Sequence, residues 1–229
     1  MRLIHYDRFD FQNHSTISDG ALSPLELLAH ARSIGVRGVV LTEHVYLTKV
    51  ESIVEKILQA VESARGADVL LIPGAEVSLV PPDKIGEVAK RAKQAGAKFV
   101  TVHGESLMGG TPAGTNLAAA QSEFVDMIGH PGFMSKEATR YAAQNNIIIE
   151  ISGRALHSLT NGHNVKMARQ FGAKMLVNSD THDPKDLMTP QRALDVARGA
   201  GMEEDEVFSA LVTNVEEVLA RCGIIAPTH

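Results

Sequence analysis

Cysteine and tryptophan are the residues that this chain uses least. Among its 229 residues there is one cysteine, Cys222, and no tryptophan. A single cysteine excludes a disulfide framework within the chain and a metal cluster held by several thiolates. We therefore expect a reducing, cytoplasmic setting. Aromatic residues make up only 4% of the chain, which disfavours the stacking platforms that bind single-stranded nucleic acid.

Long apolar runs and a strong charge bias are also missing. No segment approaches the roughly 18 consecutive apolar residues of a transmembrane helix, and the first residues, MRLIHYDRFDF, lack the apolar run of a signal peptide. The formal net charge is -5, which disfavours wide contact with nucleic acid or an anionic membrane. We expect no membrane partner, and the sequence leaves the oligomeric state open.

Apolar, strand-like runs alternate with helical patterns along the whole chain. The runs cover residues 9–13, 38–44, 69–77, 98–103, 126–130, 147–152 and 174–180. Strands that alternate with helices indicate βαβ units and a parallel sheet. At this length we predict one α/β domain spanning residues 1–229, with a closed or nearly closed barrel. A doubly wound open sheet is the alternative.

Helices are expected between these runs. The first begins with Ser23 as N-cap, Pro24 and the capping-box residue Glu26, and Gly35 ends it. Further helices are expected at about 49–65, 85–94, 117–121, 136–145 and 165–171, with three more after Pro190, Met202 and Asn214. The segment GRALHSLTNGH, residues 153–163, is expected to be a long loop.

Ionisable side chains gather where the predicted strands end. They are His14, Glu43, His44, Glu76, His103, Glu105, His130, Glu150, Asp180 and His182. In a parallel barrel the carboxyl ends of the strands converge on one face. A single histidine at a strand end is more often a hydrogen-bonded structural residue than a ligand. Imidazoles and carboxylates together at seven strand ends instead predict a metal site.

The mixture of ligand types narrows the chemistry. Imidazole and carboxylate suit zinc, manganese or iron. The donors suffice for more than one divalent ion, and a bridging carboxylate holds two ions about 3.5–4 Å apart. Such ions polarise phosphoryl oxygens and generate a bridging hydroxide. The favoured reaction is therefore metal-assisted hydrolysis of a phosphoester.

Six motifs in this order resemble the PHP (polymerase and histidinol phosphatase) family. They are NHSTISDG, LTEH, PGAEV, VHGE, GHPG and NSDTHDP, and they extend from Asp10 to about Asp186. The resemblance implies a distorted (β/α)7 TIM-like barrel with up to three divalent metal ions. It also implies phosphoesterase activity on small phosphomonoesters, as in many stand-alone members.

The resemblance also implies a ligand set. The first site would use Gln12, His14, Glu76 and Asp180, the second Glu76, His103 and His130, and the third Asp19, His44 and His182. Glu76 would bridge two ions. The family usually has a second histidine where this chain has Gln12. A glutamine amide oxygen is a neutral, weaker donor, so the affected ion is expected to be bound loosely, bound with altered geometry, or absent.

Two loops are candidates for substrate contacts. Arg154, His157, Asn161 and His163 lie in the segment after the sixth run, and an arginine fork matches two phosphate oxygens. The alternative is a capped loop without contact to substrate. The loop GESLMGGTPAGTN, residues 104–116, is a candidate flap in which Glu105 acts as supporting acid or proton donor; a mobile linker is the alternative.

Some polar residues are expected outside the ligand set. Glu43 and Glu150 are expected to orient neighbouring ligands. His5, His30 and His229 are not expected at the site.

The sequence thus predicts a phosphatase that acts on a small phosphorylated metabolite. Histidinol phosphate is one candidate substrate through the family resemblance alone. The expected catalytic residues are Glu76, Asp180, His182 and Arg154. Two alternatives remain: a nuclease or proofreading-type phosphodiesterase, and a metal-binding regulatory domain with weakened catalysis.

Overall fold

A single parallel sheet, curled into a nearly closed barrel, forms the centre of the molecule. The computed structural model describes residues 6–224. Along the barrel the strands follow chain order: β1 (Arg8–Asn13), β2 (Val36–Leu41), β4 (Leu70–Val77), β5 (Phe99–His103), β6 (Met127–Gly129), β7 (Ile148–Ser152) and β8 (Met175–Asn178). The short β3 (His44–Val45) pairs with β4. Because all pairings are parallel, the carboxyl ends of the strands lie on one face.

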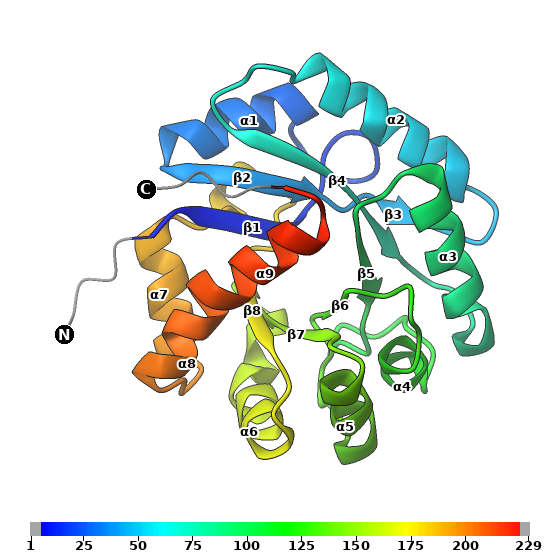
Figure 1. Ribbon diagram of the computed structural model, residues 1–229, viewed down its shortest axis with the longest axis vertical. Helices are drawn as coiled ribbons and strands as arrows, with labels where there is room; N and C mark the ends of the chain where they lie inside the picture. Colours follow the sequence, from blue (N-terminus) through cyan, green and yellow to red (C-terminus); the bar gives the residue numbers. More distant parts are fainter. Residues whose placement is uncertain (1–5, 225–229) are drawn as a thin grey trace.

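Helices surround the strands on the outside (Figure 1). They are α1 (Pro24–Ser33), α2 (Val50–Ser63), α3 (Ile85–Ala95), α4 (Thr115–Ala120), α5 (Lys136–Gln144), α6 (Asn161–Phe171), α7 (Pro190–Gly199), α8 (Glu204–Phe208) and α9 (Asn214–Arg221). The capping box of α1 forms as predicted: the Ser23 hydroxyl accepts from the Glu26 amide, and the Glu26 carboxylate accepts from the Ser23 amide. No helix within residues 6–224 has the length and apolarity needed to cross a membrane.

The barrel closes between β1 and β8 through isolated contacts rather than a continuous ladder. Asn13 and Thr181 form the one bridge found there in the described chain, and the His14 amide donates to the Thr181 carbonyl at 2.9 Å. The Phe11 amide donates to the Asn178 side chain at 3.0 Å. The predicted barrel is confirmed, and the open, doubly wound alternative is wrong because the strand order never reverses.

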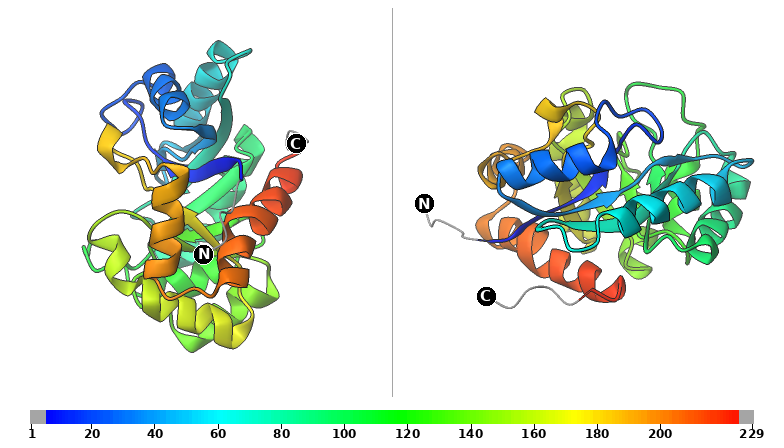
Figure 2. Two further views of the ribbon diagram at one scale, coloured as in Figure 1. Left: turned by 90° about the vertical axis from the view of Figure 1, so that its left-hand side faces the viewer. Right: turned by 90° about the horizontal axis from the view of Figure 1, so that it is seen from above.

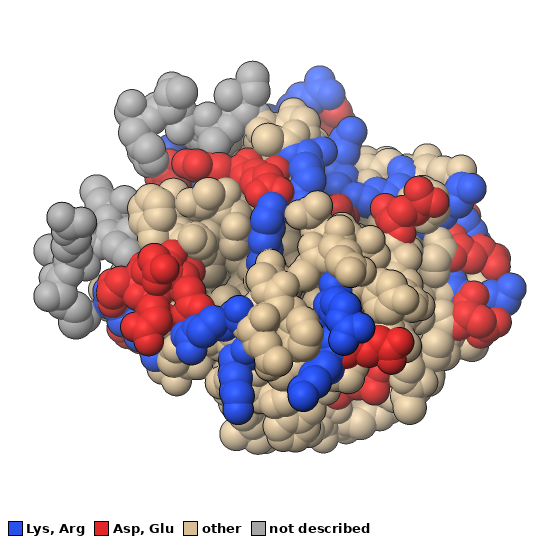
Figure 3. All heavy atoms as spheres, turned by 60° about the horizontal axis from the view of Figure 1, so that its bottom comes forward, with Lys and Arg blue, Asp and Glu red and all other residues tan. Residues whose placement is uncertain are grey.

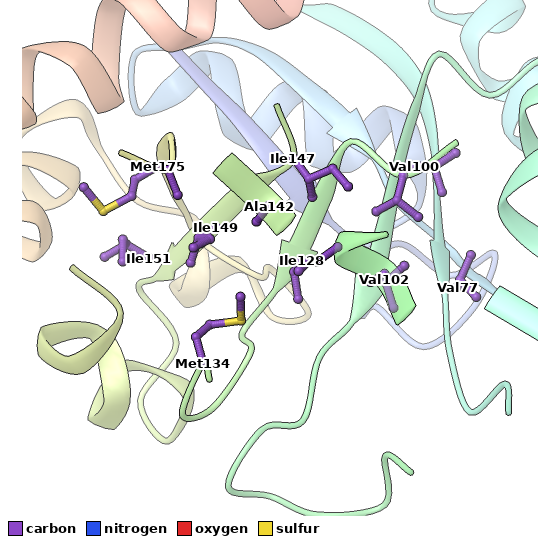
Figure 4. Packing of buried hydrophobic residues seen from close by; sticks show 14 of the residues in the cluster. Val77, Val100, Val102, Ile128, Met134, Ala142, Ile147, Ile149, Ile151 and Met175 are labelled. Carbon is purple, nitrogen blue, oxygen red and sulfur yellow. The ribbon is translucent and has the colours of Figure 1, made fainter. Parts of the chain in front are cut away.

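Two apolar layers support the barrel. Inside it, Phe11 and Phe99 pack 5.3 Å apart between ring centroids and join Ile72 and α9 side chains such as Val218. Figure 2 shows α9 on one side of the barrel and the loop after β5 on the opposite side. Outside the barrel, strand and helix side chains pack together, as Figure 4 shows for β5, β6 and β7. One end of the barrel is therefore filled by apolar side chains, which leaves the other end for polar chemistry.

Two predicted boundaries were wrong. The second strand run ends at Leu41, and His44 belongs to β3, opposite Glu76 of β4. The helix expected to start near residue 165 begins at Asn161, after a 3-10 turn over His157–Thr160. The whole segment 153–163 was predicted to be a loop. Instead the side-chain oxygen of Asn161 accepts from the Ser152 amide at 3.2 Å, and its side-chain nitrogen donates to the Ser152 carbonyl at 2.9 Å. These two hydrogen bonds anchor the first turn of α6.

A buried ion pair links the two strands at the seam. Arg8 and Asp10 are both buried, and Arg8 Nη2 lies 2.6 Å from Asp10 Oδ2. Arg8 also donates to the Val177 carbonyl at 2.8 Å, while the Ser179 amide donates to Asp10 at 3.0 Å. Charged groups of β1 thus satisfy the backbone of β8 where the ladder is incomplete.

We predict that Asp10→Asn lowers the free energy of unfolding by about 3–5 kcal/mol, because it leaves the buried Arg8 guanidinium without its counter-charge. Urea unfolding followed by circular dichroism measures the change. The control is Arg65→Gln, which removes an exposed ion pair with Glu62 and should cost less than about 1 kcal/mol. Equal losses in the two variants would contradict this role of Asp10.

Candidate metal centre

The carboxyl ends of the strands surround a cavity of about 390 Å³. Thirteen residues line it: Asp19, His44, Glu76, His103, Met108, Gly109, His130, Arg154, Ala155, Leu156, His157, Asp180 and His182. The lining therefore combines titratable side chains with the large apolar side chains of Met108 and Leu156, from the loops after β5 and β7.

Glu76 lies among the imidazoles. Alternation along β4 places Ile72 in the apolar interior of the barrel and Glu76 further along the same face. Its carboxylate is fully buried. Oε2 lies 3.0 Å from His44 Nδ1 and 3.4 Å from His14 Nε2, and Oε1 lies 3.5 Å from His130 Nε2. One carboxylate thus faces three histidines from three different strand ends.

Asp180 is a second shared carboxylate. Its Oδ1 lies 3.5 Å from His14 Nε2, and its Oδ2 lies 3.4 Å from His157 Nε2. Arg154 Nη1 donates to Oδ2 at 3.1 Å. Asp180 has a positive φ of 52° and His130 one of 29°. Left-handed backbone is uncommon for side-chain-bearing residues, and here it sets the direction of two side chains that line the cavity.

Asp19 lies at the mouth of the cavity, on the loop after β1. Its Oδ2 lies 3.3 Å from His44 Nε2 and 3.4 Å from His182 Nε2. Glu43 holds this loop: its carboxylate accepts from the Ser15 amide at 2.9 Å and from the hydroxyls of Ser15 and Ser18. The buried Glu43 therefore positions the segment that carries His14 and Asp19.

The spacing of these donor atoms is that of ligands around shared cations. Two donors bonded to one tetrahedral ion at 2.0–2.2 Å lie about 3.3–3.6 Å from each other. The contacts of His14 with Glu76, of His130 with Glu76 and of His182 with Asp19 fall at 3.4–3.5 Å. Ordinary N–H···O hydrogen bonds are shorter, about 2.7–3.2 Å.

Unpartnered polar atoms test whether the residues fit metal ions. Within the described residues, both ring nitrogens of His14 and His130, both carboxylate oxygens of Glu76 and Oδ1 of Asp180 are buried without a hydrogen-bond partner. Leaving such groups unsatisfied is costly, and buried charges are normally paired or coordinate metals. A donor set of imidazoles and carboxylates with this spacing fits divalent cations.

Charge within the cluster keeps the carboxylates ionised. Burial alone would raise the pKa of Glu76, but the imidazoles of His44, His103 and His130 outweigh it and hold that pKa well below the usual range. The pKa of Asp180 is likewise held well below its usual range, by His130 and His14 against the effect of burial. Burial lowers the pKa of His14. Deprotonated carboxylates and a neutral imidazole are the forms that bind metals.

The structure brings most of the predicted ligands together, in two groups of possible metal donors. One contains His14, Asp19, His44 and His182, and the other contains His130, His157 and Asp180. Glu76 lies between them. The His103 ring lies 4.4 Å from that of His130 between centroids, and Thr111 contacts its Nδ1 at 3.0 Å.

Gln12 is fully buried in β1. Its amide nitrogen and oxygen have no hydrogen-bond partner in the described part of the chain, and Gln12 does not line the cavity. Weak coordination of a metal ion by the Gln12 side chain stays a prediction.

Two predicted substrate contacts do not line the cavity. The Glu105 carboxylate accepts from the amides of Gly114 and Asn116, at 3.1 and 2.9 Å, at the start of α4. His163 Nε2 contacts the Met134 carbonyl at 2.8 Å. Both side chains bind backbone, which organises the loops after β5 and β6.

The remaining predicted orienting residues contact ligands or their backbone. Glu150 accepts from the His130 amide at 2.7 Å. His30, in α1, was not expected at the site; it contacts the Pro184 carbonyl and does not line the cavity. His5 and His229 lie outside the described residues.

Sequence reasoning missed Ser78. Its hydroxyl contacts His44 Nδ1 at 2.7 Å and donates to the Glu76 carbonyl at 3.3 Å. The available signal was its position two residues after Glu76, on the same face of the extended chain. It also missed the apolar Met108 and Leu156 in the cavity lining, which no local pattern marks.

Comparisons with curated proteins find relatives that match most of the chain. A search of family models gives no match. An uncharacterized protein of Methanocaldococcus jannaschii is 39% identical over 216 residues, which is 93% of this chain and 99% of the relative. Ribonuclease P protein component 3 of Methanosarcina mazei is 27% identical over 228 residues, 93% of this chain and 89% of the relative. A probable phosphatase of Thermoanaerobacter pseudethanolicus is 30% identical over 112 residues, 44% of this chain and 46% of the relative.

Solved structures share the fold. A chain of an archaeal ribonuclease P with mature tRNA superposes with a TM-score of 0.67 at 15% identity, over 93% of this chain and 91% of that chain. A two-domain protein of Bacteroides vulgatus containing a predicted PHP-like metal-dependent phosphoesterase gives 0.52 at 18% identity, over 94% of this chain and 68% of that chain.

We predict that divalent metal raises the melting temperature and that chelation reverses the rise. A ligand at one hundred times its Kd adds about 2.7 kcal/mol, or roughly 5–10 °C for a chain of this size. Glu76→Gln should lose most of the shift because Glu76 faces three histidines. The control is Glu87→Gln, at an exposed pair with Lys84. A thermal shift with Mn²⁺ or Zn²⁺ that is equal in both variants would contradict the assignment.

Gln12→His is predicted to raise metal occupancy or turnover, since it supplies the second imidazole of the family motif, two residues before His14. Elemental analysis gives metal per chain, and hydrolysis of an aryl phosphate gives turnover. Gln94→His, on the exposed side of α3, controls for the addition of a histidine. Unchanged stoichiometry and rate would show that position 12 does not limit metal binding.

Proposed function

The chain belongs to the PHP family, and from this premise we propose that it is a metal-dependent phosphoesterase acting on a small phosphomonoester. One observation supports the proposal above all: buried carboxylates and imidazoles face one another at ligand spacing, without hydrogen bonds, on the floor of an open cavity. Divalent ions held by Glu76, Asp180 and the surrounding histidines would polarise a phosphoryl group and activate water for attack.

Arg154 is the protein group suited to the charge that develops on the phosphoryl oxygens. Its Nη1 donates to Asp180 at 3.1 Å and to His182 Nδ1 at 2.8 Å, which fixes the guanidinium at the edge of the cavity. Its side chain is 35% exposed, so its remaining N–H groups are accessible to a substrate. A preorganised donor of this kind stabilises a transition state more than the ground state.

The dimensions of the cavity favour a small substrate. A volume of about 390 Å³ lies within the range of small-molecule sites. The exposed side chains of Met108 and Leu156 belong to the lining and offer an apolar surface to the leaving group. Histidinol phosphate remains one candidate substrate, on family grounds alone.

A nuclease activity is less favoured. The net charge is -5, whereas nucleic-acid interfaces are strongly basic. On the face drawn in Figure 3, basic side chains are interspersed with acidic ones instead of forming one continuous stripe.

A cytoplasmic location remains part of the proposal.

A second candidate function is that of a ribonucleoprotein subunit. The match to ribonuclease P protein component 3 over 93% of this chain supports it. A purely structural subunit, however, gives no physical reason for a buried set of unpartnered imidazoles and carboxylates, which is destabilising unless a cation fills it.

We predict that the protein hydrolyses p-nitrophenyl phosphate in the presence of Zn²⁺, Mn²⁺ or Fe²⁺ and that a chelator abolishes turnover. Arg154→Ala should lower kcat/KM about 100-fold, because a preorganised donor is lost. The control is Arg32→Ala, whose guanidinium pairs with Asp68 outside the cavity lining and which should leave kcat/KM unchanged.

Three outcomes separate the alternatives. Bound metal without turnover under any of these ions would support a regulatory domain. Tight binding of ribonuclease P RNA without turnover would support the ribonucleoprotein subunit. Hydrolysis of single-stranded DNA in preference to the aryl phosphate would support the nuclease.

A further inference from the structure

We propose that His157 is a metal ligand, which together with His130 and Asp180 forms a cation site that the family resemblance does not assign. The inference rests on the proposed function only in that both require divalent ions at the same strand ends. His157 was expected to contact substrate, and its position in the structure fits coordination better.

The first support is the geometry of the three side chains. His157 Nε2 lies 3.4 Å from Asp180 Oδ2, the separation expected for two donors on one ion, about 3.3–3.6 Å. The rings of His157 and His130 stack with their centroids 4.3 Å apart and their planes 24° apart. One donor atom from each of the three residues lies within 4.8 Å of the others. The site is therefore compact enough for one ion.

The second support is burial without hydrogen bonding. The His157 side chain is 8% exposed, and its Nδ1 is buried with no hydrogen-bond partner in residues 6–224. Both ring nitrogens of His130 share this condition. A ring nitrogen that faces a carboxylate needs a proton or a cation between them. One cation can satisfy His157, His130 and Asp180 together, because each of them can offer it a lone pair.

The third support is the rigidity of the segment that carries His157. His157 begins a 3-10 turn that leads directly into α6. The Ser158 amide donates to the Arg154 carbonyl at 2.9 Å, and the Asn161 side chain is bound to the backbone of Ser152. A ligand held on a fixed turn suits coordination, which demands a defined position.

Asp180 connects this site to its neighbour. Its Oδ1 faces His14 at 3.5 Å, and its Oδ2 faces His157 at 3.4 Å, so its two oxygens can serve different ions. The chain has a neutral amide at Gln12, where the family motif has an imidazole. His157 supplies an additional imidazole to Asp180 from the segment after β7.

Cobalt substitution tests this directly. We expect Co²⁺-loaded His157→Cys to show a sulfur-to-cobalt charge-transfer band in the near ultraviolet, because a thiolate would then bind the ion. The matched control is His163→Cys, on the adjacent α6, where Nε2 of the native residue binds the Met134 carbonyl. It should show no such band. Both are compared with Co²⁺-loaded wild-type protein at the same occupancy.

A second variant keeps the test independent of how His157→Cys folds. His157→Gln preserves side-chain bulk but weakens the donor, and it should weaken binding of one ion at least 10-fold, as elemental analysis after dialysis against limiting Zn²⁺ shows. His163→Gln should retain the wild-type content. Full metal content in His157→Gln, or the absence of the band in metal-loaded His157→Cys, would overturn the proposal.

The outcome for His157 is separable from the outcome for the enzyme. If wild-type protein hydrolyses the aryl phosphate while the His157 variants keep all their metal and only raise KM, His157 contacts substrate and this inference alone fails. If metal content depends on His157 but wild-type protein shows no hydrolysis, the proposed function alone fails.

Discussion

The buried carboxylates of Glu76 and Asp180 face imidazole nitrogens that they do not hydrogen-bond, and the architecture of this end of the barrel depends on that constraint. Donor atoms of this kind would normally move to make hydrogen bonds or reach water. Keeping them in place requires other side chains that hold the ligand-bearing segments through hydrogen bonds. Glu43 holds the loop of His14 and Asp19 in this way, and Glu150 holds the backbone of His130.

The barrel separates this polar end from an apolar one. Phe11, Ile72 and Phe99 fill the interior below the site together with side chains of α9, and this packing contributes the hydrophobic free energy that the polar end cannot. The same strands therefore serve both purposes, since Ile72 and Glu76 lie on one face of β4. Burial in the apolar half keeps the strand ends in register, and that register fixes the distances between the donors.

The order of strands and the gathering of ligands at their ends were predictable from the sequence, because alternating apolar runs determine a parallel barrel and the barrel determines where its carboxyl ends meet. Individual partners were less predictable. Glu105 and His163 had the right residue types but bind backbone amides and a carbonyl instead. His157 lies in a segment without periodicity, so its stacking on His130 became visible only from the position of the turn before α6. The pairing of Arg8 with Asp10 was missed because two charges in a strand suggest solvent.

The incomplete seam between β1 and β8 has a consequence for how the molecule assembles. The contacts that close it join residues 169 positions apart, such as Asp10 and Ser179, and His14 meets Asp180 across the same seam. An ion shared by those two side chains would link the first strand of the barrel to the last. It would also restrict the unfolded chain, because it would close a very long loop. All residues up to Asp180 must have been synthesised before both side chains exist, so an ion shared by them would bind only late in synthesis.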